Sequence, residues 1–399
     1  MRLYVVARGT LALMRKRRVV VLGATGSIGQ SAAKVARDIP ERMEIVGMSA
    51  HRNAEKLAEL SREFPNARLC VTDAEIFSKS SARFGGSARC LSGEEGLIEL
   101  ATMPEADLVL IAIVGTGGLR PALAAIEAGK DIAVASKEIL VMAGEIVMDA
   151  ARRRGVKVLP VDSEHNAIFQ CLENRDVREV TRLILTASGG PFRKMPAEEL
   201  ANVTPEQALK HPTWNMGAKI TIDSATLFNK GLEMIEARWL FGVEMARVDV
   251  VVHPQSIVHS MVEFVDGSVL AQLSHSDMCF PIQYAVTWPE RVANTLRPLD
   301  FAELSRLEFE RPRSTDFPAL DLARRAGETG GTLPAVLNAA NEIAVEAFLQ
   351  NRIRFPRIWE TVALVMDAHR AVAHATLDAI LRADFEAREH ALQLVSSAR

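Results

Sequence analysis

The chain has 399 residues, of which 48% are hydrophobic and 24% charged, and at roughly 150 residues per domain it should hold two or three packed units. Lys and Arg total 47 against 50 Asp and Glu, which leaves a formal net charge of −3. This balance excludes a protein that gathers nucleic acid or an anionic membrane surface through its overall field. The longest apolar run has seven residues (108–114), far short of the ~20 that a membrane-spanning helix needs.

Cysteine usage favours a reducing compartment, and we expect a cytoplasmic protein. Cys70, Cys90, Cys171 and Cys279 lie far apart, without the spacing of a zinc knuckle or the density of a disulfide scaffold. The first 37 residues contain no acid, a bias shared with some transit peptides. We expect residues 1–17 to form a short extension instead, because no long apolar segment or cleavage-like site is present there.

The N-terminal part of the chain, residues 18–161, alternates strand-like and helix-like segments. The β-branched runs are Val19–Leu22, Glu44–Ser49, Leu108–Val114, Ile132–Ala135 and Val156–Val161. Ala-rich, helix-like segments separate these runs. This alternation predicts an α/β fold, with a Rossmann-like parallel sheet and helical crossovers.

The middle of the chain, residues 162–295, has a different pattern. Val248–Val252 reads as a strand, and His259–Phe264 and Ser268–Leu273 are two further strands joined by Asp266-Gly267, a hairpin signal. We expect an α+β catalytic domain here, with helices on one face of an antiparallel or mixed sheet.

The last part of the chain is helical. Residues 296–318 are rich in proline and charge and form a predicted connector. In residues 319–399, apolar positions recur at three- and four-residue steps between Pro334 and Leu394. This pattern predicts a C-terminal helical bundle.

A glycine-rich loop follows the first strand and precedes the helix-like segment Gln30–Arg37. In such a loop, free backbone N–H groups and the positive end of the helix dipole converge on a phosphate, and glycines permit close approach. The spacing is G-x-x-G-x-x-G, so the prediction of a dinucleotide site depends on the strand–loop–helix context. An ordinary β-turn-α corner is the alternative. The candidate cofactor-binding residues are Gly23, Thr25, Gly26, Ser27 and Ile28.

The end of the second predicted strand distinguishes NAD from NADP. An NAD site places Asp or Glu there, whereas a cationic or amide group suits a 2′-phosphate. This strand ends in His51, Arg52 and Asn53, with no acid before Glu55. The sequence therefore predicts NADPH, with Arg52 as the phosphate clamp because its planar fork matches phosphate oxygens. The alternative is that Arg52 is a solvated surface residue.

Two carboxylates follow the strand Val156–Val161. If the segment stays extended, Asp162 and Glu164 point the same way at the carboxyl edge of the sheet. Like charges so close call for a cation, and oxygen ligands favour Mg²⁺ or Mn²⁺. Capping of the next helix is the alternative.

A third carboxylate is expected on the predicted helix Phe228–Phe241. One polar stripe of this helix carries Asn229, Glu233 and Glu236, and Lys230 stands at i, i+3 to Glu233. We expect Glu236 to lie on a solvated face, where Lys–Glu pairs contribute a few tenths of a kcal/mol. For Asn229, Lys230 and Glu233 the choice between surface and site depends on their surroundings.

Phosphate donors and a mobile loop complete the candidate site. Ser188 before two glycines, together with Ser224, Asn229 and Lys230, offers the donors that a phosphate monoester requires. Each serine alone is more often a turn or cap residue. The segment 211–217 combines a rigid proline, Trp214 and a hinge glycine, which suits a lid that excludes water. A static loop anchored by its tryptophan is the alternative.

Taken in chain order, these motifs resemble the family of 1-deoxy-D-xylulose 5-phosphate reductoisomerases. The resemblance runs from about Val19 into the C-terminal helices. The motifs are Gly23-Ala-Thr-Gly-Ser-Ile-Gly29, Ser136-Lys-Glu138, Asp162-Ser-Glu-His-Asn166, Ser188-Gly-Gly190, His211-Pro-Thr-Trp214 and Asn229-Lys-Gly-Leu-Glu233.

The resemblance implies an NADPH-dependent and metal-dependent homodimeric enzyme of isoprenoid biosynthesis, which acts on a small phosphorylated sugar. It implies Asp162, Glu164 and Glu233 as metal ligands and Lys137, Glu164 and His211 as catalytic residues. The implied substrate contacts are Lys137, Ser163, Glu164, Ser188, His211, Trp214, Ser224, Asn229, Lys230 and Glu233. Ser136, Glu138 and Gly217 join the cofactor set.

The sequence departs from the family pattern at Ser136, where Asn is usual, at His51, where a small or amide residue is usual, and at Ala218, where Arg is frequent. Two of these lie near the expected cofactor site, so they bear on NADPH affinity. Two other functions stay open: a metal-independent NADP dehydrogenase, in which the carboxylates are helix caps, and an NADPH-binding sensor without activity.

Overall fold

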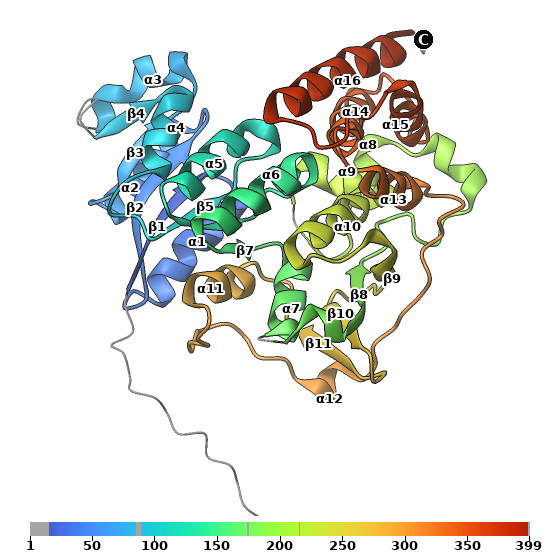
Figure 1. Cartoon of the computed structure of the whole chain (residues 1–399), viewed down its shortest axis with the longest axis horizontal. Coiled ribbons are helices and arrows are strands. Elements are labelled where there is room, and N and C mark those ends of the chain that lie inside the picture. Colours follow the sequence, from blue (N-terminus) through green and yellow to red (C-terminus); the bar gives the residue numbers. More distant parts are fainter. Residues whose placement is uncertain (1–15, 85–88, 174, 215, 398–399) are drawn as a thin grey trace, which may run out of the picture.

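The computed structural model describes residues 16–84, 89–173, 175–214 and 216–397. Almost all of the predicted extension over residues 1–17 lies outside these ranges. Figure 1 shows a strand-rich N-terminal part, a second and smaller sheet, and a group of C-terminal helices. No helix within the described ranges is long and apolar enough to cross a membrane.

The N-terminal sheet has seven parallel strands in the order β4-β3-β2-β1-β5-β6-β7. The strands are β1 (Arg17–Leu22), β2 (Met43–Ala50), β3 (Arg68–Val71), β4 (Cys90–Ser92), β5 (Leu108–Ile111), β6 (Asp131–Val134) and β7 (Val158–Pro160). This order confirms the predicted Rossmann-like sheet. Strands β1 to β4 extend the sheet to one side and strands β5 to β7 extend it to the other, so the strand order reverses between β1 and β5. β5 is shorter than predicted, because the chain leaves the sheet after Ile111 and Val114 is 81% exposed.

Helices cover both faces of this sheet. They are α1 (Ser27–Asp38), α2 (Ala54–Glu63), α3 (Ala74–Ser80), α4 (Gly93–Ala101), α5 (Leu119–Glu127) and α6 (Glu138–Arg154). Side chains alternate along a strand, so Val19 and Val21 pack with α1 and α2, whereas Val20 and Leu22 pack with α4 and α5. Both faces of β1 are therefore buried from Val19 to Leu22, which explains the unbroken apolar run over these four residues.

The second sheet is mixed, with strand order β11-β10-β8-β9. Its strands are β8 (Val180–Ala187), β9 (Val248–Val252), β10 (Val258–Phe264) and β11 (Val269–Leu273). β10 and β11 form the predicted hairpin through Asp266-Gly267, and β8 and β9 run parallel. The helices of this region are α7 (Ser163–Leu172), α8 (Pro205–Ala208), α9 (Ala218–Thr226), α10 (Phe228–Phe241) and α11 (Cys279–Thr287). α11 shares the core of α1 in the N-terminal part.

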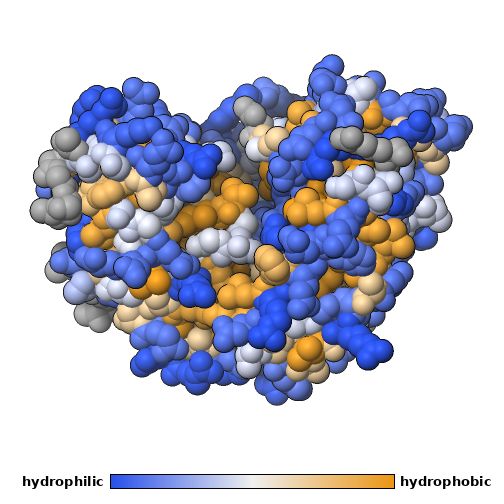
Figure 2. Space-filling view, turned by 90° about the horizontal axis from the view of Figure 1, so that it is seen from above, coloured by the Kyte–Doolittle hydropathy of each residue, from blue (hydrophilic) through white to orange (hydrophobic). Residues whose placement is uncertain are grey.

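The C-terminal part is helical, as predicted. It contains α13 (Ala319–Thr329), α14 (Leu333–Leu349), α15 (Arg357–Ala368) and α16 (Leu377–Ser397), whereas the short helix α12 (Phe301–Leu304) lies within the predicted connector. Residues of α10, α13, α14 and α16 belong to one hydrophobic core with the second sheet. The predicted fold class is confirmed. Figure 2 shows the surface hollowed between the N-terminal part and the helices on the right, with apolar side chains in the hollow.

Candidate active site

A cavity of about 670 Å³ lies where the parallel sheet, the second sheet, α9 and α10 meet. The predicted residues that line it are Gly26, Ser27, Ile28, Ser136, Lys137, Glu138, Asp162, Ser163, Glu164, Ser188, His211, Trp214, Gly217, Ser224, Asn229, Lys230 and Glu233. Gly23, Thr25, His51, Arg52 and Asn53 are not among the lining residues. Residues from segments more than 200 positions apart thus share one space.

Three carboxylates converge in this cavity. Asp162, Glu164 and Glu233 each offer an oxygen, and the three oxygens lie within 4.8 Å of one another. Glu233 is fully buried on α10, whereas Asp162 and Glu164 stand at the start of α7. Oxygen donors without sulfur suit a hard divalent cation, so this donor set fits Mg²⁺ or Mn²⁺.

The predicted backbone conformation of Asp162 and Glu164 is wrong. Asp162 and Glu164 do not share an extended segment, because α7 begins at Ser163. Asp162 occupies the N-cap position of α7 but makes no side-chain capping bond; it lies 2.5 Å from the Lys137 ammonium instead. This arrangement contradicts the helix-cap alternative for Asp162.

Two buried lysines lie among the carboxylates. Lys137 Nζ is 3.0 Å from Glu233 Oε1 and donates to Asn229 Oδ1 over 2.9 Å. Lys230 Nζ is 2.7 Å from Glu164 Oε1 and also bonds Glu233. Asn229 Nδ2 donates to Glu233 Oε1 over 2.6 Å. Asn229 and Lys230, predicted as phosphate ligands, therefore contact the carboxylates in this structure.

The charged groups in this cluster shift one another's pKa values. Burial and the neighbouring Glu164 raise the pKa of Glu233 to about 7. Burial also opposes the charge of Glu164, but the Lys230 ammonium holds the pKa of Glu164 well below its usual range. Burial likewise opposes the charge of Lys137, but Asp162 and Glu233 hold the pKa of Lys137 well above its usual value. Titratable groups with strongly shifted pKa values that share a cavity are typical of an active site.

Glu236 does not lie on a solvated face, so that prediction is wrong. Its side chain is fully buried, and its Oε2 lies 3.4 Å from Nδ1 of the buried His165. Burial raises the pKa of Glu236 well above its usual value. The stripe that carries Glu233 and Glu236 faces α6 and α7 instead of water, which helical periodicity alone cannot distinguish.

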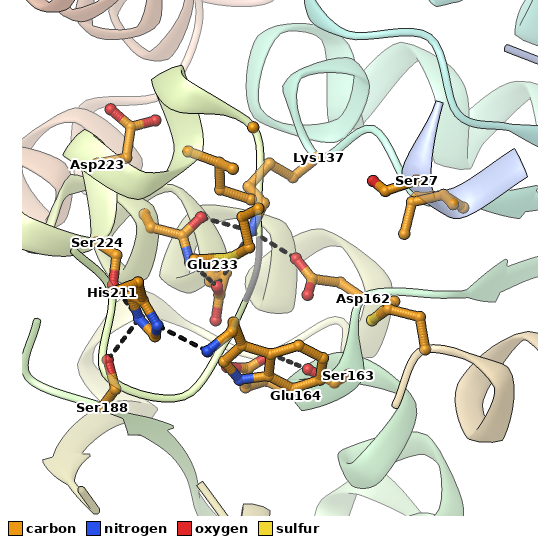
Figure 3. Close-up of a pocket in the computed structure, with 18 of the residues that line it drawn as sticks. Ser27, Lys137, Asp162, Ser163, Glu164, Ser188, His211, Asp223, Ser224 and Glu233 are labelled. Atoms are coloured by element: carbon orange, nitrogen blue, oxygen red, sulfur yellow. Dashed lines mark hydrogen bonds and ion pairs between the residues drawn. The ribbon is translucent and has the colours of Figure 1, made fainter. Parts of the chain in front are cut away.

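The two candidate phosphate hydroxyls face each other across an imidazole. His211 Nδ1 accepts hydrogen bonds from the backbone N–H groups of Thr213 and Trp214, over 3.2 and 2.9 Å. The ring proton is therefore on Nε2, which lies 2.9 Å from Ser188 Oγ and 3.1 Å from Ser224 Oγ. Burial lowers the pKa of His211 to about 4. Figure 3 shows this trio on the side of the cavity opposite Asp162.

A glycine brings the two serines together. Gly190 has a φ of +67°, and a Cβ built there would lie 2.9 Å from the Ser224 carbonyl oxygen and 2.9 Å from Ala225 Cα. The loop that carries Ser188 therefore approaches the backbone of α9 more closely than a side chain would allow. The predicted lid, residues 211–217, has no helix or strand among its described residues; Asn215 lies outside them.

The glycine loop has the close packing that a dinucleotide site requires. A Cβ on Gly23 would lie 2.4 Å from the Ala112 carbonyl oxygen, and one on Gly29 would lie 2.4 Å from the backbone of Ala24. Gly26 is the N-cap of α1. These approaches set the loop against the ends of β1 and β5 and leave the first N–H groups of α1 at the cavity.

Three further cofactor candidates follow β2, which pairs with β1, and Ser136 follows β6. The side chain of Arg52 is 75% exposed, and its guanidinium is 2.9 Å from Asp73. His51 Nδ1 lies 2.9 Å from Thr72 Oγ1, and Asn53 caps α2 by accepting from Lys56 N. Ser136 is buried and donates to the backbone carbonyl of Ile113. Their cofactor roles stay predictions.

Several cavity residues were not predicted. His259 on β10 lines the cavity with its ring 6.3 Å from that of Trp214. Lys219 and Asp223 line it from α9. Asp223 directly precedes the predicted Ser224, which was the available sequence signal. His259 had none, because an alternating strand pattern does not show which histidine reaches a cavity.

Fold and site together define an α/β oxidoreductase with a glycine loop and a carboxylate cation site. Models of the 1-deoxy-D-xylulose 5-phosphate reductoisomerase match residues 19–144, and models of its C-terminal domains match residues 158–241 and 273–390. The reductoisomerase of Symbiobacterium thermophilum is 54% identical over 94% of this chain and 98% of its own length. The chain belongs to the 1-deoxy-D-xylulose 5-phosphate reductoisomerase family.

Other relatives agree in sequence and structure. The reductoisomerase of Chlorobaculum tepidum is 53% identical over 94% of this chain and 98% of its own. A structure of the Zymomonas mobilis reductoisomerase in complex with NADPH superposes with a TM-score of 0.89 at 44% identity, covering 96% of this chain and all of the other. A reductoisomerase in complex with NADPH, fosmidomycin and magnesium gives a TM-score of 0.87 at 41% identity, covering 95% and 98%.

Proposed function

We propose that this protein converts 1-deoxy-D-xylulose 5-phosphate to 2-C-methyl-D-erythritol 4-phosphate, using NADPH and a divalent cation. The observation that carries the proposal is one cavity lined by the glycine loop, by the carboxylates Asp162, Glu164 and Glu233, and by the Ser188–His211–Ser224 trio. Complexes of related enzymes with NADPH and magnesium support both cofactors. The product follows from the family assignment.

The residues of the chain bind and orient the substrate. Ser188, Ser224 and the Nε2–H of His211 offer neutral donors to the phosphate oxygens, and Lys230 adds a positive charge nearby. The phosphate thus fixes one end of the substrate, and the carboxylate cluster lies at the other. Holding both ends aligns the reacting carbons and lowers the entropic part of the barrier.

The carboxylates and Lys137 act at the reacting end. When bound, the cation supplies Lewis-acid polarisation of the substrate oxygens, and NADPH supplies the hydride. Asp162, Glu164 and Glu233 would hold the cation. Lys137, whose ammonium stays protonated between Asp162 and Glu233, stabilises negative charge that develops on an oxygen. His211 and Trp214 line the cavity, and the loop that carries them excludes water from it.

An assay with purified protein, NADPH, Mg²⁺ and 1-deoxy-D-xylulose 5-phosphate tests the proposal directly. We expect loss of the reduced nicotinamide absorbance that depends on all four components. Chelation with excess EDTA should abolish turnover, and added Mg²⁺ or Mn²⁺ should restore it. Full turnover in EDTA would support a metal-independent dehydrogenase, and NADPH binding without oxidation at any substrate concentration would support a sensor.

The same proposal includes a homodimer in the cytoplasm. β11 is an edge strand, and Val269 and Leu270 on it are 47% and 38% exposed. An apolar edge strand is a surface that a second copy can cover. The four cysteines are buried and unpaired, which suits a reducing compartment. Light scattering after size exclusion should give about twice the 43.6 kDa of one chain; a monomer at micromolar concentration contradicts the dimer.

A further inference from the structure

A polar network at the edge of the predicted site connects α9 to two other parts of the molecule. Asp223 on α9 is 1% exposed. Asn341 Nδ2, from α14, donates to Asp223 Oδ1 over 2.7 Å, and Lys219 Nζ lies 2.8 Å from Asp223 Oδ2. Each carboxylate oxygen therefore has one strong donor, and the two donors come from different elements.

Lys219 continues this network into the cofactor domain. Its ammonium lies 3.4 Å from Glu138 Oε1, in the first turn of α6 and next to Lys137. Lys219 and Asp223 stand one turn apart on α9, and both line the cavity. Asp223, Lys219 and Glu138 thus connect α9, which bears Ser224, to α6, whose N-cap is Lys137.

Asn341 is a costly residue for a purely structural role. It is fully buried on α14, and its Oδ1 has no hydrogen-bond partner among the residues that the structure describes. A buried amide with one half unsatisfied loses free energy that an apolar side chain of similar shape would keep. The contact that explains an amide here is the bond to Asp223.

The position of Asp223 matters because Ser224 follows it directly. The Ser224 hydroxyl faces His211 and Ser188 in the trio that we assign to the phosphate, and the Gly190 loop rests on the backbone of Ser224 and Ala225. A rotation of this turn of α9 would move the Ser224 hydroxyl away from His211 and Ser188. Donors that are held in place before binding lose less entropy on binding.

Building on the proposed function, we propose that Lys219 and Asn341 are positioning residues. They hold the Asp223 carboxylate so that α9 presents Ser224 to the phosphate of the substrate. Lys219 also ties this turn to Glu138 and so to the cofactor side of the cavity. The C-terminal helices thereby take part in substrate binding through Asn341, without touching the substrate.

Binding measurements that need no turnover test this proposal. Calorimetry with inorganic phosphate and fluorescence titration with NADPH are compared for the unmutated protein and for Asn341→Leu and Lys219→Met. We expect Asn341→Leu to weaken phosphate binding at least about fivefold and to leave NADPH binding within about twofold, because Asp223 is the only hydrogen-bond partner of the Asn341 side chain among the described residues. Lys219→Met should weaken both ligands, because it also releases Glu138.

Two further variants separate positioning from general destabilisation. Lys219→Arg keeps the charge and a donor and should restore phosphate binding to within about threefold. Lys56→Met removes a lysine from an exposed pair with Glu59 on α2 and should change neither dissociation constant. A merely structural role would lower the melting temperature and the active fraction but leave the dissociation constants of the folded protein unchanged.

Clear outcomes would overturn the proposal. Phosphate binding unchanged in Asn341→Leu contradicts it, whatever happens to Lys219→Met, and Asn341→Leu also decides the matter if Lys219→Met fails to fold. If Lys219→Arg binds phosphate as weakly as Lys219→Met does, the role assigned to the Lys219 charge is wrong. If the unmutated protein binds phosphate and NADPH but does not turn over 1-deoxy-D-xylulose 5-phosphate, the proposed function fails while the positioning result still stands.

Discussion

At the scale of single residues, Glu233 is the group on which the proposed cation site depends most. It is fully buried, it faces Glu164 across the cluster, and it contacts both Lys137 and Lys230. Burial raises its pKa to about 7, so near neutral pH a proton competes with a cation for this carboxylate. Glu164 stays ionised because Lys230 holds its pKa far lower.

The first prediction follows from that competition. Between pH 8 and pH 6 the ionised fraction of Glu233 falls about tenfold, since its pKa is about 7. We therefore expect the dissociation constant for Mn²⁺, followed by electron paramagnetic resonance, to rise about tenfold over this range. Glu233→Gln should bind more weakly and show a flatter dependence. An affinity independent of pH in the unmutated protein would contradict the role of Glu233.

The second prediction concerns turnover. Glu233→Gln keeps the shape of the side chain but removes its charge, so we expect kcat to fall at least about a hundredfold, or ~2.7 kcal/mol of barrier. Circular dichroism should show an intact fold. Glu244→Gln is the matched control, because Glu244 is exposed just beyond α10. Near-normal turnover of Glu233→Gln would exclude it as a metal ligand.

The third prediction tests the choice of cofactor. Arg52 stands at the end of β2 with an exposed guanidinium beside Asp73, where it can bond a 2′-phosphate. We expect Arg52→Ala to raise KM for NADPH about tenfold, roughly the loss of one charge-assisted hydrogen bond, and to change KM for NADH little. Arg62→Ala on the exposed face of α2 is the control. Equal effects on both cofactors would remove the phosphate argument.

At the scale of elements, the sequence predicts what depends on local pattern and misses what depends on packing. Phe228–Phe241 forms the predicted helix, and the Asp266-Gly267 hairpin is present. β3 and β4 were missed because they contain apolar runs of only three and two residues, shorter than the four of β5. The burial of Glu236 was missed because it depends on α6 packing against α10 and on His165 of α7 lying beside Glu236.

The loop that carries Ser188 and Gly190 gives the fourth prediction, at this same scale. Gly190→Ala places a Cβ 2.9 Å from the backbone of Ser224 and Ala225, at a φ of +67°, so the Ser188 loop must move away from α9. We expect KM for the substrate to rise about tenfold, with a stability loss of about 1–3 kcal/mol. Gly267→Ala has a similar φ of +81° but nothing within 4 Å.

Comparison of the two glycine variants separates the effect of backbone strain from the effect of moving the Ser188 loop away from α9. Gly267→Ala in the β10–β11 turn should lose stability through its backbone alone and keep KM unchanged. If Gly190→Ala behaves in the same way, the close approach of the two serine-bearing segments does not matter for substrate binding.

At the scale of the whole molecule, the site is where three parts meet. The parallel sheet contributes the glycine loop and Lys137, the mixed-sheet region contributes the carboxylates and serines, and α14 reaches in through Asn341. Figure 3 shows side chains from several of these elements facing one another. Buried charges there lie in pairs of opposite sign, which lowers the cost of burying them. The two proposed anion sites are therefore local features, and the net charge of −3 does not reveal them.

The free energy of unfolding of the whole protein should depend on pH because of a buried histidine beside this site. His165 is fully buried at the contact of α7 with α10, and its Nε2 donates to the Glu233 carbonyl over 2.9 Å. Burial lowers the pKa of His165 to about 4. Between pH 6.5 and 4 the unfolded chain binds a proton that the native protein does not, so the free energy of unfolding falls as the pH falls.

Urea denaturation of the metal-free protein at pH 7 and pH 5 measures this effect. We expect a loss of about 2 kcal/mol from His165 alone, since 1.36 kcal/mol corresponds to one pKa unit. His165→Gln keeps an N–H donor for the Glu233 carbonyl but cannot take up a proton, so its stability should fall less over the same range. The comparison of each protein with itself at pH 7 removes the cost of the substitution. An equal acid-induced loss in both proteins would show that His165 does not supply it.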